Sequence, residues 1–467
     1  MSTEMIIEEA SIEAVESSLQ HHKQFFKSGV TRPLQYRKDL LEKFSTVIKN
    51  HEAEIIDALK KDLNKSEMET YATEIGILLE EIRFVLKNID EWAEPKKVKT
   101  AKTHIGSKAY TVPEPYGVTL IIAPWNYPIQ LALAPVIGAI AAGNTAIIKP
   151  SELTPSTSAL LAQMINTHFD PRQLFVIEGG VETTQHLLKQ PFDYIFFTGS
   201  VPVGKVVMEA AAKQLIPVTL ELGGKSPCIV DETADIPLAA KRIAFGKVTN
   251  AGQTCIAPDY LFIHKSKKDE FITEFKKTVI EFYGTEPLKS DKFGRIVNER
   301  HFNRLTSYLE DGEILLGGNV DSGSLKIEPT LMKPRDFTVP VMQDEIFGPV
   351  FPVIEYEELD EVIDFVTERP KPLALYLFTS NPITEERING SISYGGGCVN
   401  DTLMHIVTPY LPFGGVGESG IGNYHGESSF STFSHYKSIL KQTTKFDLSF
   451  RYPSGRFGMQ IIKKLLK

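Results

Sequence analysis

A chain of 467 residues is too long for one hydrophobic core, which stops growing near ~250–300 residues, so two sizeable domains are expected. With 42% apolar and 23% charged residues, its composition is that of an ordinary globular protein. The net charge of −9 argues against binding to nucleic acid, which needs a basic surface.

The three cysteines do not form the pattern of a disulfide framework or a zinc site. Cys228, Cys255 and Cys398 are an odd, sparse set, and none belongs to a CxxC pair. This usage favours a reducing, cytoplasmic location. The N-terminus is acidic and lacks the basic region that begins a signal peptide, so no signal peptide is predicted.

The first hundred residues are predicted to be mainly helical. After Pro33, apolar residues recur at helical spacing: Leu40, Leu41, Phe44, Val47, Ile48, Ile55, Ile56 and Leu59. Residues 100–115 lose this period, and their loose alternation predicts a β-ribbon.

The segment from Pro115 to Ile148 has no charged residue and is long enough to span a bilayer. Three prolines interrupt it, however, and lipid would leave the backbone groups that they free without hydrogen-bond partners. The segment is therefore predicted to form a strand, a turn, a buried helix and a second strand.

From residue 117 onward, short β-rich runs alternate with helical ones. Strands are predicted at 118–123, 146–148, 175–177, 194–198 and 218–220, with helices at 131–142 and 203–212. This alternation predicts a parallel, doubly wound sheet, which binds ligands at the carboxyl ends of its strands. A second alternating region follows, with helices at 243–249 and 269–282, strands at 260–264, 350–354 and 375–378, and a β-like run at 430–440.

Two glycine-containing segments could bind a dinucleotide. Gly415–Gly420 matches the literal G-x-G-x-x-G pattern, but no strand precedes it and no clear helix follows, so it is rejected as the pyrophosphate site. Thr198–Gly204 ends a predicted strand and opens a helix, which would aim backbone N–H groups at a diphosphate. On spacing alone, an ordinary strand–helix turn is the commoner explanation.

Lys149 and Glu152 follow another predicted strand, where a cation and a carboxylate would suit the hydroxyls of a ribose. A carboxylate at the 2′-hydroxyl favours NAD, because it would repel the 2′-phosphate of NADP. A solvated turn with capping residues explains the two residues equally well.

Cys255 is the cysteine best placed for chemistry. Small and polar residues surround it, in Asn-Ala-Gly-Gln-Thr-Cys-Ile-Ala-Pro, where backbone donors could stabilise an exposed thiolate. Most free cysteines are instead small buried hydrophobic residues, which is the interpretation for Cys228 and Cys398.

Two further residues could assist such a thiol. Glu221 ends a predicted strand between leucine and two glycines, a partly desolvated position that would raise its pKa and suit a general base. An exposed strand-end glutamate is the alternative. Asn126, also at a strand end, offers an amide as an oxyanion donor. The eleven histidines show no metal-ligand spacing, and no metal site is predicted.

Together and in this order, these motifs resemble the aldehyde dehydrogenase superfamily. They comprise Pro124-Trp-Asn-Tyr-Pro128, Lys149-Pro-Ser-Glu152, Phe197-Thr-Gly-Ser200, Glu221-Leu-Gly-Gly-Lys225, Gly252-Gln-Thr-Cys255, Glu345-Ile-Phe-Gly-Pro349 and Leu411-Pro-Phe-Gly-Gly415. The tyrosine in Trp-Asn-Tyr-Pro and the runs 294–298 and 422–426 are similar to the class 3 branch, which includes enzymes for aromatic and medium- to long-chain aldehydes.

The resemblance implies a role for each matching residue. Cys255 would attack the aldehyde carbon, and Asn126 with the Cys255 backbone N–H would hold the oxyanion. Glu221, assisted by Glu345, would activate the water that hydrolyses the thioester. The cofactor, NAD or NADP, would be bound by Lys149 and Glu152 at the adenine ribose, by Gly199, Ser200 and Gly204 at the pyrophosphate, and by Glu345 and Phe347 at the nicotinamide ribose and ring.

One departure from the family pattern concerns this cofactor. Val201-Pro202 follows Ser200, where many relatives carry threonine, so a hydroxyl contact to the diphosphate is missing. The preference between NAD and NADP therefore stays open, and class 3 relatives often use both.

The resemblance also implies a Rossmann-like cofactor domain, a second α/β catalytic domain and a β-ribbon that links the protomers of a homodimer. The predicted boundaries are 1–99 and 117–220 for the cofactor domain, 221–407 for the catalytic domain, 100–116 and 427–445 for the ribbon, and 446–467 for a basic tail. Between Arg451 and Lys467 this tail has five basic and no acidic residues, with apolar residues among them. It predicts weak contact with a membrane surface, and a loose or dimer-docked terminus is the alternative.

The predicted reaction is the oxidation of an apolar aldehyde to its carboxylic acid. A CoA-acylating or acyl-phosphate reductase would share the thioester but would not use water, and Glu221 argues against it. A cysteine hydrolase would lack the features at 149–152 and 198–204. A non-catalytic protein would not be expected to keep Cys255, Glu221 and Asn126 together.

Overall fold

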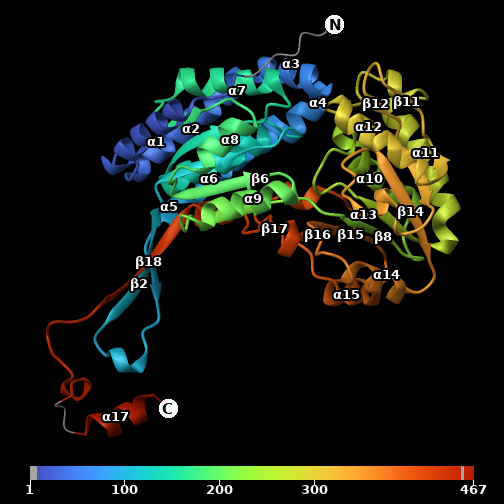
Figure 1. The fold of residues 1–467 in the computed structure, drawn as a ribbon. Helices are drawn as coiled ribbons and strands as arrows, with labels where there is room; N and C mark the ends of the chain where they lie inside the picture. Colours follow the sequence, from blue (N-terminus) through green and yellow to red (C-terminus); the bar gives the residue numbers. More distant parts are fainter. Residues whose placement is uncertain (1–7, 454–456, 467) are drawn as a thin grey trace.

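The computed structural model describes residues 8–453 and 457–466. Two parallel sheets with helices on both faces form the body, and a small ribbon projects from it (Figure 1). The predicted α/β class is therefore confirmed. In the described part of the chain, no helix has the length and apolar character needed to cross a membrane.

The first sheet has the order β17-β7-β6-β3-β4-β5, and only β17 runs antiparallel to its neighbour. Its strands are β3 (Val118–Ile122), β4 (Thr145–Lys149), β5 (Leu174–Val176), β6 (Tyr194–Thr198), β7 (Val218–Glu221) and β17 (Gly420–Ile421). Strands β3, β4 and β6 are buried along their whole length, as expected for a parallel sheet covered on both faces.

Helices cover both faces of this sheet. One face packs against α2 (Leu34–Asn50), α3 (Glu52–Leu63), α5 (Gly76–Ala93), α6 (Gln130–Ala142) and α7 (Pro155–His168). The other face packs against α1 (Ile12–Lys27), α8 (Val181–Leu188) and α9 (Val201–Ala212). Between α3 and α5 lie α4 (Glu67–Thr70) and a π-helical segment, η1 (Tyr71–Ile75).

The second sheet has the order β10-β13-β14-β9-β8-β15-β16, with only β10 antiparallel. Its strands are β8 (Pro227–Val230), β9 (Tyr260–His264), β10 (Gly312–Leu316), β13 (Thr330–Pro334), β14 (Val350–Tyr356), β15 (Ala374–Phe378) and β16 (Gly396–Val399). The helices around it are α10 (Ile236–Val248), α11 (Lys268–Tyr283), α12 (Glu299–Ser307), α13 (Pro340–Gln343), α14 (Leu359–Thr367) and α15 (Pro382–Ser391). A hairpin of β11 (Val320–Asp321) and β12 (Lys326–Ile327) lies beside them.

The ribbon is a three-stranded antiparallel sheet of β1 (Lys96–Val98), β2 (Lys108–Pro115) and β18 (Ser434–Lys441), in that order. It extends away from the body and carries α17 (Gly458–Leu465) near its far end (Figure 1). The ranges predicted for the ribbon omit β1, which is exposed along its length and so gives no apolar pattern. They also include α16 (Glu427–Thr432), which is a helix packed against α6.

The cap of α7 comes from a neighbouring helix. Thr154 precedes α7 and Pro155 begins it, but the Thr154 side chain makes no capping hydrogen bond. Asp62 of α3 caps the helix instead, accepting from the backbone N–H groups of Ser156 at 3.2 Å and Thr157 at 2.8 Å. Only the packing of α3 against α7 brings this carboxylate to the helix end.

Candidate active site

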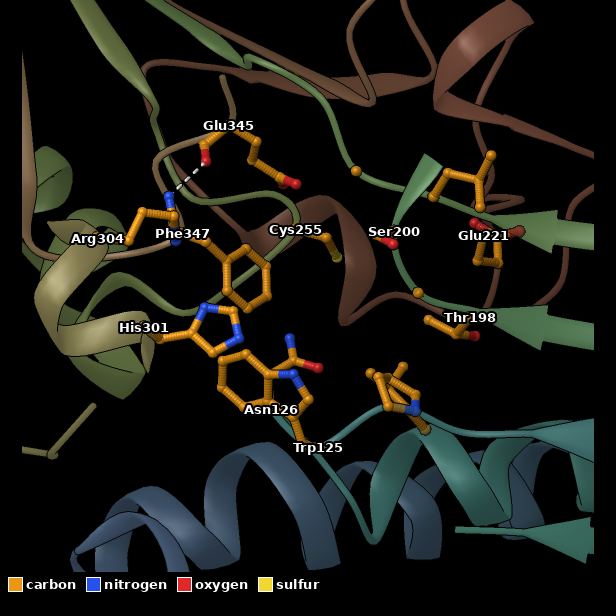
Figure 2. Close-up of a pocket in the computed structure, with 15 residues that line it drawn as sticks. Trp125, Asn126, Thr198, Ser200, Glu221, Cys255, His301, Arg304, Glu345 and Phe347 are labelled. Atoms are coloured by element: carbon orange, nitrogen blue, oxygen red, sulfur yellow. Dashed lines mark hydrogen bonds between the residues drawn. The ribbon is translucent and has the colours of Figure 1, made fainter. Parts of the chain in front are cut away.

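The carboxyl ends of the first sheet face the second domain across a cavity of about 190 Å³ (Figure 2). The cavity walls include most of the predicted site residues: Asn126, Gly199, Ser200, Glu221, Cys255, Glu345 and Phe347. Lys149, Glu152 and Gly204 lie outside these walls. The fold thus gathers residues from both domains around one space.

Cys255 lies in a rigid loop that follows α10. Asn250 and Ala251 have φ angles of +52°, and Gly252 has +75°. A side chain on Gly252 would overlap the Gly348 backbone, so glycine is required there. A left-handed conformation costs about 1–3 kcal/mol for a residue with a side chain. This strained stretch leads directly into the turn that carries the thiol.

The Cys255 thiol is a weak acid in the free protein. Burial raises its pKa to about 12, and the Glu345 and Glu221 carboxyls act in the same direction. Backbone N–H groups of Cys255 and Ile256 partly oppose this shift, as donors to a thiolate would. Among the described residues, no cation contributes to the pKa of this thiol.

The Glu221 carboxyl ends β7 and points into the cavity (Figure 2). Glu221 is 3% exposed, and neither of its carboxylate oxygens has a hydrogen-bond partner among the described residues. Burial raises its pKa well above the usual range. A buried acid without partners is unusual in a purely structural role, because an unsatisfied polar group destabilises the fold.

Glu345 lies on the wall that the second domain contributes. Burial and the nearby Asp259 carboxylate raise its pKa to about 8, although the Gly224 N–H, Lys225 and Arg304 oppose the shift. Its Oε1 atom has no partner among the described residues.

Asn126 follows β3 and presents its amide beside Cys255 (Figure 2). Its Nδ2 donates to the Gln253 carbonyl oxygen at 3.1 Å, which leaves one N–H for a ligand in the cavity. The residue is buried, so an oxyanion there would meet this donor without competition from bulk water.

The N-terminus of α9 provides a place for an anion. Ser200 precedes the helix and its side chain makes no capping bond, so the N–H groups of Val201 and Val203 stay available, whereas Pro202 has none. A side chain on Gly204 would overlap Leu222, so this glycine lets α9 lie close to the loop after β7. Near the end of β4, Lys149 Nζ pairs with Glu152 Oε2 at 2.8 Å. These residues fit a dinucleotide with its pyrophosphate at the helix end.

The rejected pattern at Gly415–Gly420 forms a 3-10 turn followed by β17, and no helix begins there. No group of histidine, cysteine or acidic residues in the described ranges could hold a metal ion.

Two cavity residues, His301 and Arg304, were not identified from the sequence. Arg304 donates to the Ile346 carbonyl at 2.9 Å and to that of Glu345 at 3.4 Å, which fixes the segment carrying Glu345. The His301 ring packs on Trp125 with 5.3 Å between centroids, and Trp125 packs on Phe347 at the same distance. In the sequence, His301 and Arg304 stand three residues apart on a helix that Asn298 caps. This spacing places them on one face of the helix but does not show that the face borders the cavity.

Comparison with known proteins agrees with this geometry. The aldehyde dehydrogenase family model matches residues 3–439. The 4,4'-diaponeurosporen-aldehyde dehydrogenase of Staphylococcus aureus is 50% identical over 455 residues, covering 97% of this chain and 99% of that protein. Aldehyde dehydrogenase family 3 member A2 of Macaca fascicularis is 46% identical over 441 residues, covering 94% and 91%.

A solved structure described as the substrate-bound state of Staphylococcus aureus AldH superposes with a TM-score of 0.95 at 49% identity, covering 97% of this chain and 99% of that one. The chain therefore belongs to the aldehyde dehydrogenase family. It is an enzyme that oxidises aldehydes, and the predicted similarity to the class 3 branch is confirmed by the match to a family 3 member.

Proposed function

We propose that the enzyme oxidises an apolar aldehyde, aromatic or of medium to long chain, to its carboxylic acid with NAD or NADP. The observation that carries this proposal is the meeting of Cys255, Asn126 and the unpartnered Glu221 carboxyl in one buried cavity. The similarity to family 3, and to a relative named for 4,4'-diaponeurosporen-aldehyde, supports the apolar substrate.

In the proposed mechanism, the Cys255 thiol gives up its proton to solvent water, and the resulting thiolate sulfur adds to the aldehyde carbon. The carbonyl oxygen becomes an oxyanion that accepts hydrogen bonds from Asn126 Nδ2 and the Cys255 backbone N–H. When bound, the nicotinamide would accept the hydride that leaves the aldehyde carbon. Hydride loss leaves a thioester on Cys255. Water then adds to that thioester while Glu221 takes its proton, with Glu345 assisting, and the acid leaves as the thiol reforms.

The cofactor would lie across the end of the first sheet. We assign its pyrophosphate to Gly199, Ser200 and Gly204, its adenine ribose to Lys149 and Glu152, and its nicotinamide portion to Glu345 and Phe347. The Glu152 carboxylate disfavours a 2′-phosphate. Its partner Lys149 can offset that repulsion, which is compatible with the use of both cofactors.

The test is a comparison of kcat/KM for NAD- and NADP-linked oxidation of short, aromatic and long-chain aldehydes. Burial of a methylene contributes about 0.8 kcal/mol, so kcat/KM is expected to rise by up to about fourfold for each methylene added. A maximum at the shortest aldehyde would contradict the apolar assignment. A CoA-acylating or acyl-phosphate reductase would instead need CoA or phosphate for NADH formation, which the same assay measures when each is added or omitted.

We further propose a homodimer assembled through the ribbon. Strand β18 is an edge of the three-stranded sheet and lies away from the body, so its outer backbone groups can pair with a second copy (Figure 1). A monomer in sedimentation at micromolar concentration would contradict this assembly.

We also propose a cytoplasmic location, which the three unpaired cysteines support.

The C-terminal tail is proposed to make weak contact with an anionic membrane surface. In α17, exposed Lys463 and Lys464 lie near exposed apolar side chains, Met459 within the helix and Leu466 directly after it. The full chain is expected to co-sediment with phosphatidylglycerol vesicles more strongly than a chain ending at Phe450, and neither should bind neutral vesicles. Equal binding by both chains would exclude the tail. Residues 454–456 and 467 of this tail lie outside the described part of the chain.

A further inference from the structure

Lys65 and Glu74 form an ion pair buried behind the cavity. Lys65 Nζ lies 2.5 Å from Glu74 Oε1, and both side chains are fully buried. Two charges in such a place are unfavourable unless further hydrogen bonds satisfy them. Neither residue lines the cavity and neither belongs to the motifs described above, so the mechanism as derived does not use them.

The Lys65 ammonium contacts both sides of the proposed oxyanion site. It donates to the backbone carbonyl of Asn126 at 2.9 Å and lies 3.9 Å from the centroid of the Tyr127 ring. The Tyr127 hydroxyl is 2.6 Å from Thr254 Oγ1, and Thr254 immediately precedes Cys255. One cation therefore holds the backbone of the amide donor and, through Tyr127, the loop of the nucleophile.

The Glu74 carboxylate fixes the helix that begins just after Asn126. Its Oε2 atom accepts from the backbone N–H groups of Ile129 and Gln130, both at 3.0 Å. No side chain of the local N-cap residue does this for α6, so Glu74 is the cap. Glu74 belongs to the π-helical segment η1, the kind of local irregularity that is frequent at functional sites.

Asn250 completes the support from the other domain. Its Nδ2 donates to the Asn126 carbonyl at 2.8 Å and to the Gln253 carbonyl at 3.1 Å. The Asn126 amide donates to this same Gln253 carbonyl. The backbone oxygen of Asn126 thus receives two buried donors, and its side-chain amide is held at a fixed angle.

We propose that Lys65 and Glu74 are positioning residues that hold the Asn126 amide at the oxyanion site. The inference rests on the proposed role of Asn126 as oxyanion donor. Stabilisation of an oxyanion depends on donors that are already in place, and a misplacement of 1 Å can slow a reaction by about 10²-fold. The pair thereby fixes the position of Asn126 relative to the loop that carries Cys255.

The test replaces both members of the ion pair together, in Lys65→Met/Glu74→Gln, so that neither partner is left without the other. Glutamine keeps an oxygen acceptor for the α6 N–H groups. The single-turnover rate of NADH formation is expected to fall by about 10- to 100-fold, while the Kd for NAD, measured by fluorescence titration, stays unchanged. The matched control is Lys326→Met, because Lys326 is also buried and donates to a backbone carbonyl, that of Ser290 at 2.6 Å. This control is expected to lower Tm without slowing NADH formation.

A double-mutant cycle with Asn126→Ala distinguishes positioning from general stability. If the pair acts through the amide, Lys65→Met/Glu74→Gln slows the wild-type enzyme but has no further effect in the Asn126→Ala background. An equal factor in both backgrounds, or a lower Tm with an unchanged rate, would overturn the inference. Asn126→Ala with a wild-type rate would instead overturn the oxyanion role and the inference with it. Glu74→Gln alone, which keeps Lys65, should show the same pattern with a smaller factor if the double substitution does not fold.

Discussion

Replacement of Cys255 by alanine is expected to lower steady-state turnover by about 10⁴-fold or more, because no other group facing the cavity can form the thioester. NADH formation with a saturating aldehyde measures this loss. The fold should be retained, since Cys255 lines the cavity and its replacement by alanine removes only the sulfur atom. A variant with substantial turnover would remove Cys255 as the nucleophile.

Cys398→Ala is the matched control for this loss. Cys398 is also a partly buried thiol, 3.5 Å from His405 Nδ1, but it does not line the cavity. The control should keep normal turnover.

Alkylation of Cys255 offers a second measurement, because only the thiolate reacts. With a pKa of about 12 in the free protein, Cys255 should alkylate about tenfold faster for each unit of rising pH. A rate that levels off near neutral pH would contradict this burial effect.

Glu221→Gln is expected to give one equivalent of NADH in a burst and then to stall, with steady-state turnover lowered by about 10²–10⁴-fold. The amide cannot take a proton from water, so the thioester accumulates on Cys255. Quenched-flow measurement of the burst amplitude and mass analysis of the acylated protein test this directly. Unchanged steady-state turnover would exclude Glu221 as the base.

The pH dependence gives an independent check on Glu221. Burial raises its pKa well above the usual range, so its basic carboxylate form becomes more abundant as pH rises. Steady-state turnover limited by hydrolysis should therefore still increase with pH above the usual range of a glutamate. Glu345→Gln should keep much of this dependence if Glu345 only assists. Glu221→Gln should lose it.

Local patterns predicted five of the six strands of the first sheet and three of the seven strands of the second, because buried parallel strands are short, continuous apolar runs. Residues 194–198 and 260–264 match β6 and β9 in both bounds. Patterns failed where an element has no apolar face of its own. Exposed β1 is one case, and α16, read as part of a β-like run, is another.

The sequence alone determined the family and pointed to Cys255, Glu221 and Asn126, because each is embedded in a short motif whose neighbours shape its chemistry. The tertiary structure decided what surrounds them. It brings His301 and Arg304 to the cavity from α12, and Lys65 and Glu74 to Asn126 from the N-terminal helices. Their partners lie far along the chain, and helical spacing alone does not tell which buried charge meets which carbonyl. For Cys255 itself, only the fold shows that burial of the thiol opposes its ionisation.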